Sequence, residues 1–209
     1  MKKKGKIILA VLLILFLAIG GFLFAERDNI AAFLQGRNLS AAELEQSLAE
    51  NRDRIAEVAK KFSVRDLTEE EKQALRDGTM TAEELQEKLA GMDDEVARLI
   101  ARLYLLREKY TMMLEALESD AQAELTILSN EGKKKSELIG FARTYITKAN
   151  TMERECDSEL DEIVDELKKL EKDGKTDESV RDMVIETYTT EKSLKKAYYV
   201  SKMKERGLI

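Results

Sequence analysis

The sequence predicts an all-α protein in which an N-terminal transmembrane helix precedes long amphipathic helices that form an elongated coiled coil or antiparallel helical bundle. Three observations predict this class. The 209 residues contain no proline, and 36% of them are charged; this is typical of long helices, because an interior proline costs about 3 kcal/mol. An uncharged apolar run occupies residues 7–25. Beyond it, apolar residues recur at alternating steps of three and four, as in coiled coils.

Residues 7–25 are long enough to cross a bilayer. A helix of this length, at about 1.5 Å per residue, spans about 28 Å, close to a hydrocarbon core of about 30 Å. The run ends in Leu23-Phe24-Ala25, and this leucine stands where a signal-peptidase site has a small residue. We therefore expect an uncleaved signal anchor. The alternatives are a cleaved signal peptide, which would give a secreted form, and a buried core helix.

The charges that flank this run predict its orientation. The four lysines within residues 1–6 precede it, whereas only Arg27 and Arg37 follow it closely. The positive-inside rule then places residues 1–6 in the cytoplasm as a basic tail. We expect a single-pass protein of the cell membrane, with everything after Ala25 outside the cytoplasm.

The remainder of the chain divides into three segments by its helix start and stop signals. We expect a linker over 26–39, short capped helices over 40–91 with a helix-turn-helix at 68–90, and a three-helix coiled-coil or bundle region over 92–209 with turns near 130–133 and 173–176. Apolar residues are missing around Gly132, which favours a hairpin turn. One continuous helix over 93–172 is the competing interpretation.

Capping boxes predict where the short helices begin. A Ser or Thr precedes a Glu by three residues at Ser40–Glu43, Thr68–Glu71 and Thr81–Glu84, so that each side chain can satisfy the other residue's backbone N–H.

The segment from Asp77 to Glu84 is like the second half of an EF-hand loop. Gln73 and Leu75 would fill the first ligand positions, which leaves too few oxygens for calcium. The stretch LRDGTMTAEEL, Leu75 to Leu85, and the residues through Lys88 contain a leucine, a glycine turn, a threonine cap, paired acids and a lysine. In this order they resemble the SHOCT helix-turn-helix, which would imply a small interaction or oligomerisation module.

The apolar repeats predict which faces are buried. One seam follows Leu44, Leu48, Asn51, Ile55, Val58 and Phe62; a longer one runs from Met92 to Leu117; a third runs from Ile139 to Leu170. Asn51 is either a register-setting residue of an oligomer or an exposed asparagine on an amphipathic face. The last helix carries a looser stripe that includes Val184, Tyr188 and Leu194 and leaves Val200 off it.

Charge limits the choice of partners. The formal net charge is −6 and residues 1–6 contribute +4, so the remaining residues carry −10. This acidic balance argues against nucleic acid, whose phosphates require a basic face. Acidic residues crowd 153–166 and lysines crowd 192–204. A fold-back at Gly174 would place Glu153 and Asp157 beside the Lys192–Lys196 turn.

The sequence offers little catalytic chemistry. Without histidine there is no imidazole acid or base and no histidine-based triad. We expect no catalytic, cofactor-binding or metal-binding residue and no enzyme activity. Cys156, the single cysteine, lies at a seam position, where a small buried hydrophobic residue is the expected role. An intermolecular disulfide is its alternative.

These patterns predict location and architecture better than activity. We expect a membrane-anchored extracytoplasmic protein that acts as a structural scaffold or protein–protein interaction component of the cell envelope. Its partners would be the membrane, through residues 7–25, and other proteins or further copies of itself, through the helical seams. No small-molecule substrate is evident. The alternative is a helical bundle that binds a ligand or serves as a sensor.

Overall fold

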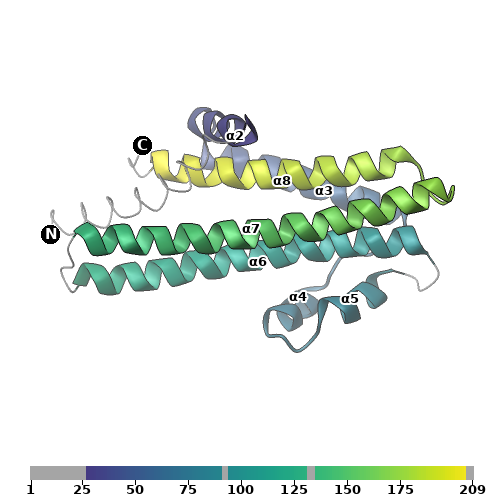
Figure 1. Ribbon diagram of the computed structural model, residues 1–209, viewed down its shortest axis with the longest axis horizontal. Coiled ribbons are helices and arrows are strands. Elements are labelled where there is room, and N and C mark those ends of the chain that lie inside the picture. The colour runs from purple at the N-terminus through teal and green to yellow at the C-terminus, as the bar shows by residue number, and fades with distance from the viewer. Residues whose placement is uncertain (1–26, 91–93, 131–134, 206–209) are drawn as a thin grey trace. The chain divides into compact units, whose positions relative to one another are not determined.

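The computed structural model describes residues 27–90, 94–130 and 135–205, and this part of the chain contains helices and no strand (Figure 1). The helices are α2 (Arg27–Asn38), α3 (Ala41–Lys61), α4 (Glu69–Arg76), α5 (Ala82–Leu89), α6 (Glu95–Asn130), α7 (Lys135–Lys172) and α8 (Glu178–Glu205). The prediction of an all-α helical bundle is confirmed. The chain divides into two compact units, which are described in turn.

The predicted anchor at 7–25 lies outside the described residues. Among the described helices, none combines the length and the apolar character needed to cross a bilayer. The anchor therefore stays a prediction. Immediately after it, where the sequence predicts a linker over 26–39, the structure contains helix α2.

Unit 1 comprises the described residues within 1–48, 114–152 and 191–209. In it, the start of α3 packs on the end of α8 through a cluster of Leu44, Leu48, Leu194 and Ala197, with Leu39 and Tyr198 at its edge. Leu39, which precedes the capping residue Ser40, packs against the cluster that contains Leu44, as in a hydrophobic staple. A second cluster joins the end of α6 to the start of α7 through Ala121, Phe141 and Tyr145. Its buried α7 side chains, Phe141 and Tyr145, are not among the residues of the predicted seam, which begins with Ile139, Ala142, Ile146 and Ala149.

Helices α6 and α7 form an antiparallel pair. The Tyr145 hydroxyl donates a hydrogen bond to Glu124 Oε2 over 2.9 Å. In one continuous helix these residues would lie about 30 Å apart at about 1.5 Å per residue. The chain therefore reverses between them. The turn predicted near 130–133 falls largely on residues 131–134, outside the described residues.

Unit 2 comprises residues 49–113 and 153–190, and the first half of α6 lies at its centre. Between Val96 and Leu106, Arg98 is exposed, Arg102 is half-buried and all the other residues are buried. A seam of one stripe predicts burial on one side of the helix, whereas here Ile100, Ala101 and Leu105 are buried as well. A helix that is apolar all round is surrounded by other elements, so α6 is a central helix of this unit.

Ion pairs in unit 2 also join α6 to α7. Arg102 pairs with Glu162 and Glu166, and Lys109 pairs with Glu159. Three carboxylates of the acidic segment 153–166 therefore form ion pairs with basic residues of α6. The sequence predicts instead that this segment lies beside lysines of the last helix. The proximity of Glu153 and Asp157 to the Lys192–Lys196 turn stays a prediction.

Asn51 links α3 to α8 within unit 2. Its side chain is buried, at 3% exposure, and its Nδ2 donates a hydrogen bond to the backbone carbonyl of Thr187 over 3.2 Å. The interpretation as an exposed asparagine is wrong. A buried amide that bonds to a particular carbonyl fixes the register of two helices, and here both helices belong to the same chain.

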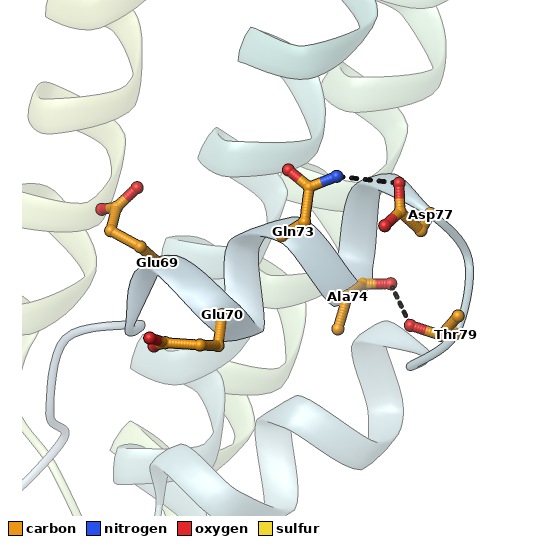
Figure 2. A pocket seen from close by; sticks show the side chains of 6 residues that line it. All are labelled: Glu69, Glu70, Gln73, Ala74, Asp77 and Thr79. Carbon is orange, nitrogen blue, oxygen red and sulfur yellow. Dashed lines mark hydrogen bonds between the residues drawn. The ribbon is translucent and has the colours of Figure 1, made fainter.

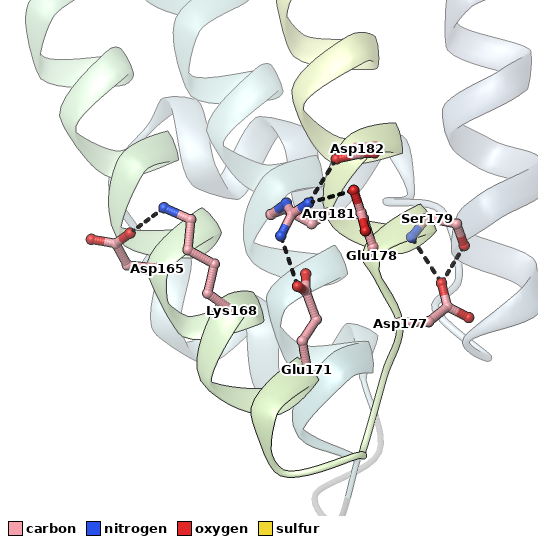
Figure 3. A network of polar contacts seen from close by, with 8 residues as sticks. All are labelled: Asp165, Lys168, Glu171, Asp177, Glu178, Ser179, Arg181 and Asp182. Carbon is pink, nitrogen blue, oxygen red and sulfur yellow. Dashed lines mark hydrogen bonds and ion pairs between the residues drawn. The ribbon is translucent and has the colours of Figure 1, made fainter.

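The turn between α7 and α8 is held by a polar network, which Figure 3 shows. Gly174 adopts a φ of +70°, a conformation that favours glycine. Asp177 accepts the backbone N–H of Ser179 over 2.8 Å at the start of α8. The Arg181 guanidinium donates to Glu171 of α7 over 2.7 Å and to Asp182 over 3.1 Å. The network therefore ties the two helices together next to the turn.

Cys156 lies in the core of unit 2, at 0% exposure. Burial, with the nearby carboxylate of Glu159, raises the pKa of its thiol to about 11. Because the thiolate is the reactive form, this cysteine is inert in the folded chain. The buried-hydrophobic interpretation agrees with this position, whereas an intermolecular disulfide would require the core to open.

Candidate functional site

Two places in the described chain have features suited to a function. The first, in unit 1, is the junction at which α8 contacts α2 and the start of α3, directly after the predicted anchor. The second, in unit 2, is the hairpin of α4 and α5. The sequence predicts no catalytic, cofactor-binding or metal-binding residue. The described residues contain no group of three or more potential metal-ligating side chains.

Helix α2 approaches α8 closely at Gly36. An added Cβ at this glycine would lie 2.6 Å from Val200 Cβ and would overlap the carbonyl oxygen of Ala197. Ala32, one turn earlier, is also fully buried. Two small residues four apart let helix backbones come together. The spacing Ala32-x-x-x-Gly36 is the sequence pattern that could have predicted this close contact between α2 and α8.

Val200 corrects the predicted stripe of the last helix. The sequence pattern leaves it off the apolar face, yet the structure buries it to 4% exposure. Its neighbour across the contact is Gly36 of α2. The predicted stripe describes burial against one partner helix, whereas Val200 faces a second partner, helix α2.

Polar side chains of α8 bind the backbone at the corner between α2 and α3. Lys204 Nζ donates to the Arg37 carbonyl over 2.7 Å, and Ser201 Oγ donates to the Leu39 carbonyl over 2.8 Å. The first backbone N–H of α3 donates to Glu205 Oε1 over 3.0 Å. Helix ends carry backbone groups without intrahelical partners. The last turns of α8 therefore supply partners to the end of α2 and to the start of α3.

The α4–α5 hairpin is held differently in its two arms. Helix α5 buries Leu85 and Leu89, whereas α4 has no buried residue. Complete capping boxes start both helices; at α4 the box joins the N-cap Thr68 to Glu71. A helix of this length is marginal without help. Local capping therefore contributes more to α4 than burial does.

Glu71 joins the capping box to an ion pair. Its carboxylate accepts two hydrogen bonds of 2.7 Å from the Arg65 guanidinium and one of 3.0 Å from the Thr68 backbone N–H. These donors, Arg65 above all, lower the pKa of Glu71 to about 2. The carboxylate is therefore charged at neutral pH and supports the start of α4.

A hollow of about 500 Å³ lies along α4 (Figure 2) and is lined by Glu69, Glu70, Gln73, Ala74, Asp77 and Thr79. Within it, Gln73 Nε2 donates to Asp77 Oδ1 over 2.9 Å, and the Thr79 hydroxyl donates to the Ala74 carbonyl over 3.2 Å. Gln73 and Leu75 belong to α4 itself, so this segment does not form the first half of a calcium loop. The hollow is open and acidic, which suits a polar or basic partner surface.

A second hollow of unit 2, about 270 Å³, is lined by Gln86, Glu95, Arg98, Leu99, Glu166, Lys169 and Leu170. Its two carboxylates already have partners, because Glu95 pairs with Lys175 and Glu166 pairs with Arg102. The lining contains as many basic as acidic side chains. This balance selects neither a cation nor an anion.

Comparisons with protein-family models, with curated proteins and with solved structures find no match.

The close contact at Gly36 predicts that adding one methyl group to this residue destabilises the fold. We expect Gly36→Ala to lower the free energy of unfolding by about 1–3 kcal/mol, the usual cost of overpacking. Urea unfolding of the full-length chain in detergent micelles, followed by circular dichroism, measures this change.

Gly140→Ala is the matched control for this substitution. Gly140 is also helical, but an added Cβ there meets nothing within 4 Å. Alanine is the better helix former by about 1 kcal/mol, so this variant should be as stable as the parent or more stable. Equal effects of the two substitutions would contradict the close contact at Gly36.

The lowered pKa of Glu71 predicts that α4 loosens in acid. A carboxylate whose folded pKa lies below the unfolded value stabilises the fold above about pH 4.5, and this contribution is lost as the pH falls toward about 2. Amide hydrogen exchange of α4 should therefore accelerate over this range, after correction for the intrinsic pH dependence of exchange.

Glu71→Gln should remove most of this pH dependence, because a glutamine does not titrate. Glu83→Gln in α5 is the control, since Glu83 is exposed and takes no part in a capping box. If α4 of the parent chain exchanged at the same corrected rate at both ends of the range, the role given to Glu71 would be wrong.

Proposed function

We propose that this chain is a single-pass membrane protein of the cell envelope whose extracytoplasmic helical bundle acts as a scaffold or protein–protein interaction component. Residues 7–25 would anchor it, with residues 1–6 in the cytoplasm. The described helices would present surfaces to partner proteins or to further copies of the chain.

The observation that carries this proposal is the uncharged run 7–25, followed within two residues by a helix that is bound to the bundle. A helix packed at Gly36 and held by Lys204 and Ser201 is a short, stiff connection. A scaffold benefits from such a connection, because an anchor concentrates it in two dimensions and a stiff link gives it a defined orientation.

Helix α4 supports an interaction role. It has no buried residue, and Ala74, Leu75 and Met80 in and after it are half-buried. A capped helix that the core does not cover can lay its partly apolar face into the groove of a partner. The open acidic hollow beside it adds polar groups to the same surface.

A ligand-binding or sensor bundle is the second candidate, and the hollow of about 270 Å³ in unit 2 is the observation that favours it. Its mixed charges suit a ligand with groups of both signs.

Analytical ultracentrifugation of the full-length chain in detergent separates the candidates. A scaffold of the self-associating kind gives an oligomer, whereas a ligand-binding bundle gives a compact monomer.

Cysteine accessibility in intact cells tests the predicted topology. In a Cys156→Ser background, which removes the buried thiol, we expect a membrane-impermeant maleimide to label Glu83→Cys and to leave Lys3→Cys unlabelled until the cells are opened. Labelling of Lys3→Cys alone would reverse the orientation. A mature chain that begins after residue 25 would replace the anchor with the secreted form.

A further inference from the structure

The outer face of α2 carries an apolar side chain that the bundle does not cover. Leu34 is 51% exposed, and in the described part of the chain it shares this exposure with one other large apolar side chain, Ile127. At about 100° per residue, Leu34 lies opposite the packed residues Ala32 and Gly36. Ala31, on the same outer side, is also exposed.

Chain geometry limits how far Leu34 can lie from the predicted anchor. Two peptide units separate Ala25 from Arg27 and span at most about 7 Å. From Arg27 to Leu34 the chain is helical, and at about 1.5 Å per residue it advances about 10 Å. Leu34 therefore lies within about 17 Å of the end of the apolar run along the chain, and closer if α2 is tilted. The headgroup region next to the hydrocarbon core is several ångströms thick.

Basic side chains stand beside this face. Arg37, in the last turn of α2, is exposed and lies 6.0 Å from the centre of the Phe33 ring. Lys204 of α8 donates a hydrogen bond to the Arg37 carbonyl over 2.7 Å, at the end of α2. Long basic side chains at a membrane surface can reach phosphate groups while their stems cover apolar surface.

We propose that the outer face of α2, defined by Ala31 and Leu34 and flanked by Arg37, lies in the phospholipid headgroup region of the membrane that the anchor crosses. This inference rests on the proposed function, since it requires residues 7–25 to span that membrane. A single leucine is too small a surface to recruit a free protein to a bilayer. The anchor holds it there at high effective concentration, so that a weak contact suffices to orient the bundle.

The test places a fluorophore on α2 and leaves Leu34 intact. Full-length Cys156→Ser chain with Ala31→Cys is labelled with an environment-sensitive dye and reconstituted in nanodiscs of anionic and zwitterionic phospholipids, one chain per disc. A nitroxide attached to lipid headgroups should quench this dye strongly. Iodide in solution should quench it several-fold less than the same dye at Glu83→Cys in α5.

Leu34→Ser should raise iodide quenching at position 31 several-fold. Ile127→Ser, which removes the other exposed apolar side chain, is the matched control and should leave that quenching unchanged. Circular dichroism checks that both variants keep their helix content.

The outcomes distinguish this inference from the proposed function. If the chain does not enter nanodiscs, the membrane anchor fails and the inference fails with it. If the chain enters them but the dye at position 31 is as accessible to iodide as the dye at position 83, the anchor stands and the headgroup contact is wrong. Shielding from iodide without quenching by lipid nitroxide, or shielding that appears only with two chains per disc, would assign this face to protein and would also overturn the proposal.

Discussion

Helix α8 has to bury apolar side chains against more than one neighbour, and the arrangement of α2 and α3 depends on this burial. In unit 1 its residues Leu194 and Ala197 pack on α3, while Val200 meets α2 at Gly36. The free energy gained by removing such side chains from water, about 25 cal/mol per Å², is the main favourable term. The polar contacts of Ser201 follow from it, because they form where burial has already brought the helix ends together.

The sequence predicted the helical class and much of the buried surface, because both depend on local spacing. Capping residues marked helix starts correctly, as at Thr68. Three features needed knowledge of a neighbour. Asn51 is polar yet buried, since a carbonyl of α8 satisfies it, and Val200 faces a helix that the pattern of a single stripe does not reveal. α2 itself is short and its apolar stripe is weak, so it resembles a linker.

The candidate site shows the same limit. The spacing of Ala32 and Gly36 is visible in the sequence, but small residues four apart are common in helices, and their meaning depends on what lies opposite. The capping boxes of the α4–α5 hairpin were predictable because each is a contact between residues three apart. Helix α4 has no buried residue. This exposure depends on how unit 2 packs, so the local sequence pattern does not predict it.

The proposed scaffold requires that α2 connect the predicted anchor to the bundle stiffly. The most direct measurement is the distance between spin labels at Ala31 in α2 and Gln46 in α3, both within unit 1, by pulsed electron paramagnetic resonance on the full-length chain in a bilayer. A docked α2 gives one narrow distance distribution. A broad distribution, as expected of a flexible linker over 26–39, would contradict the account.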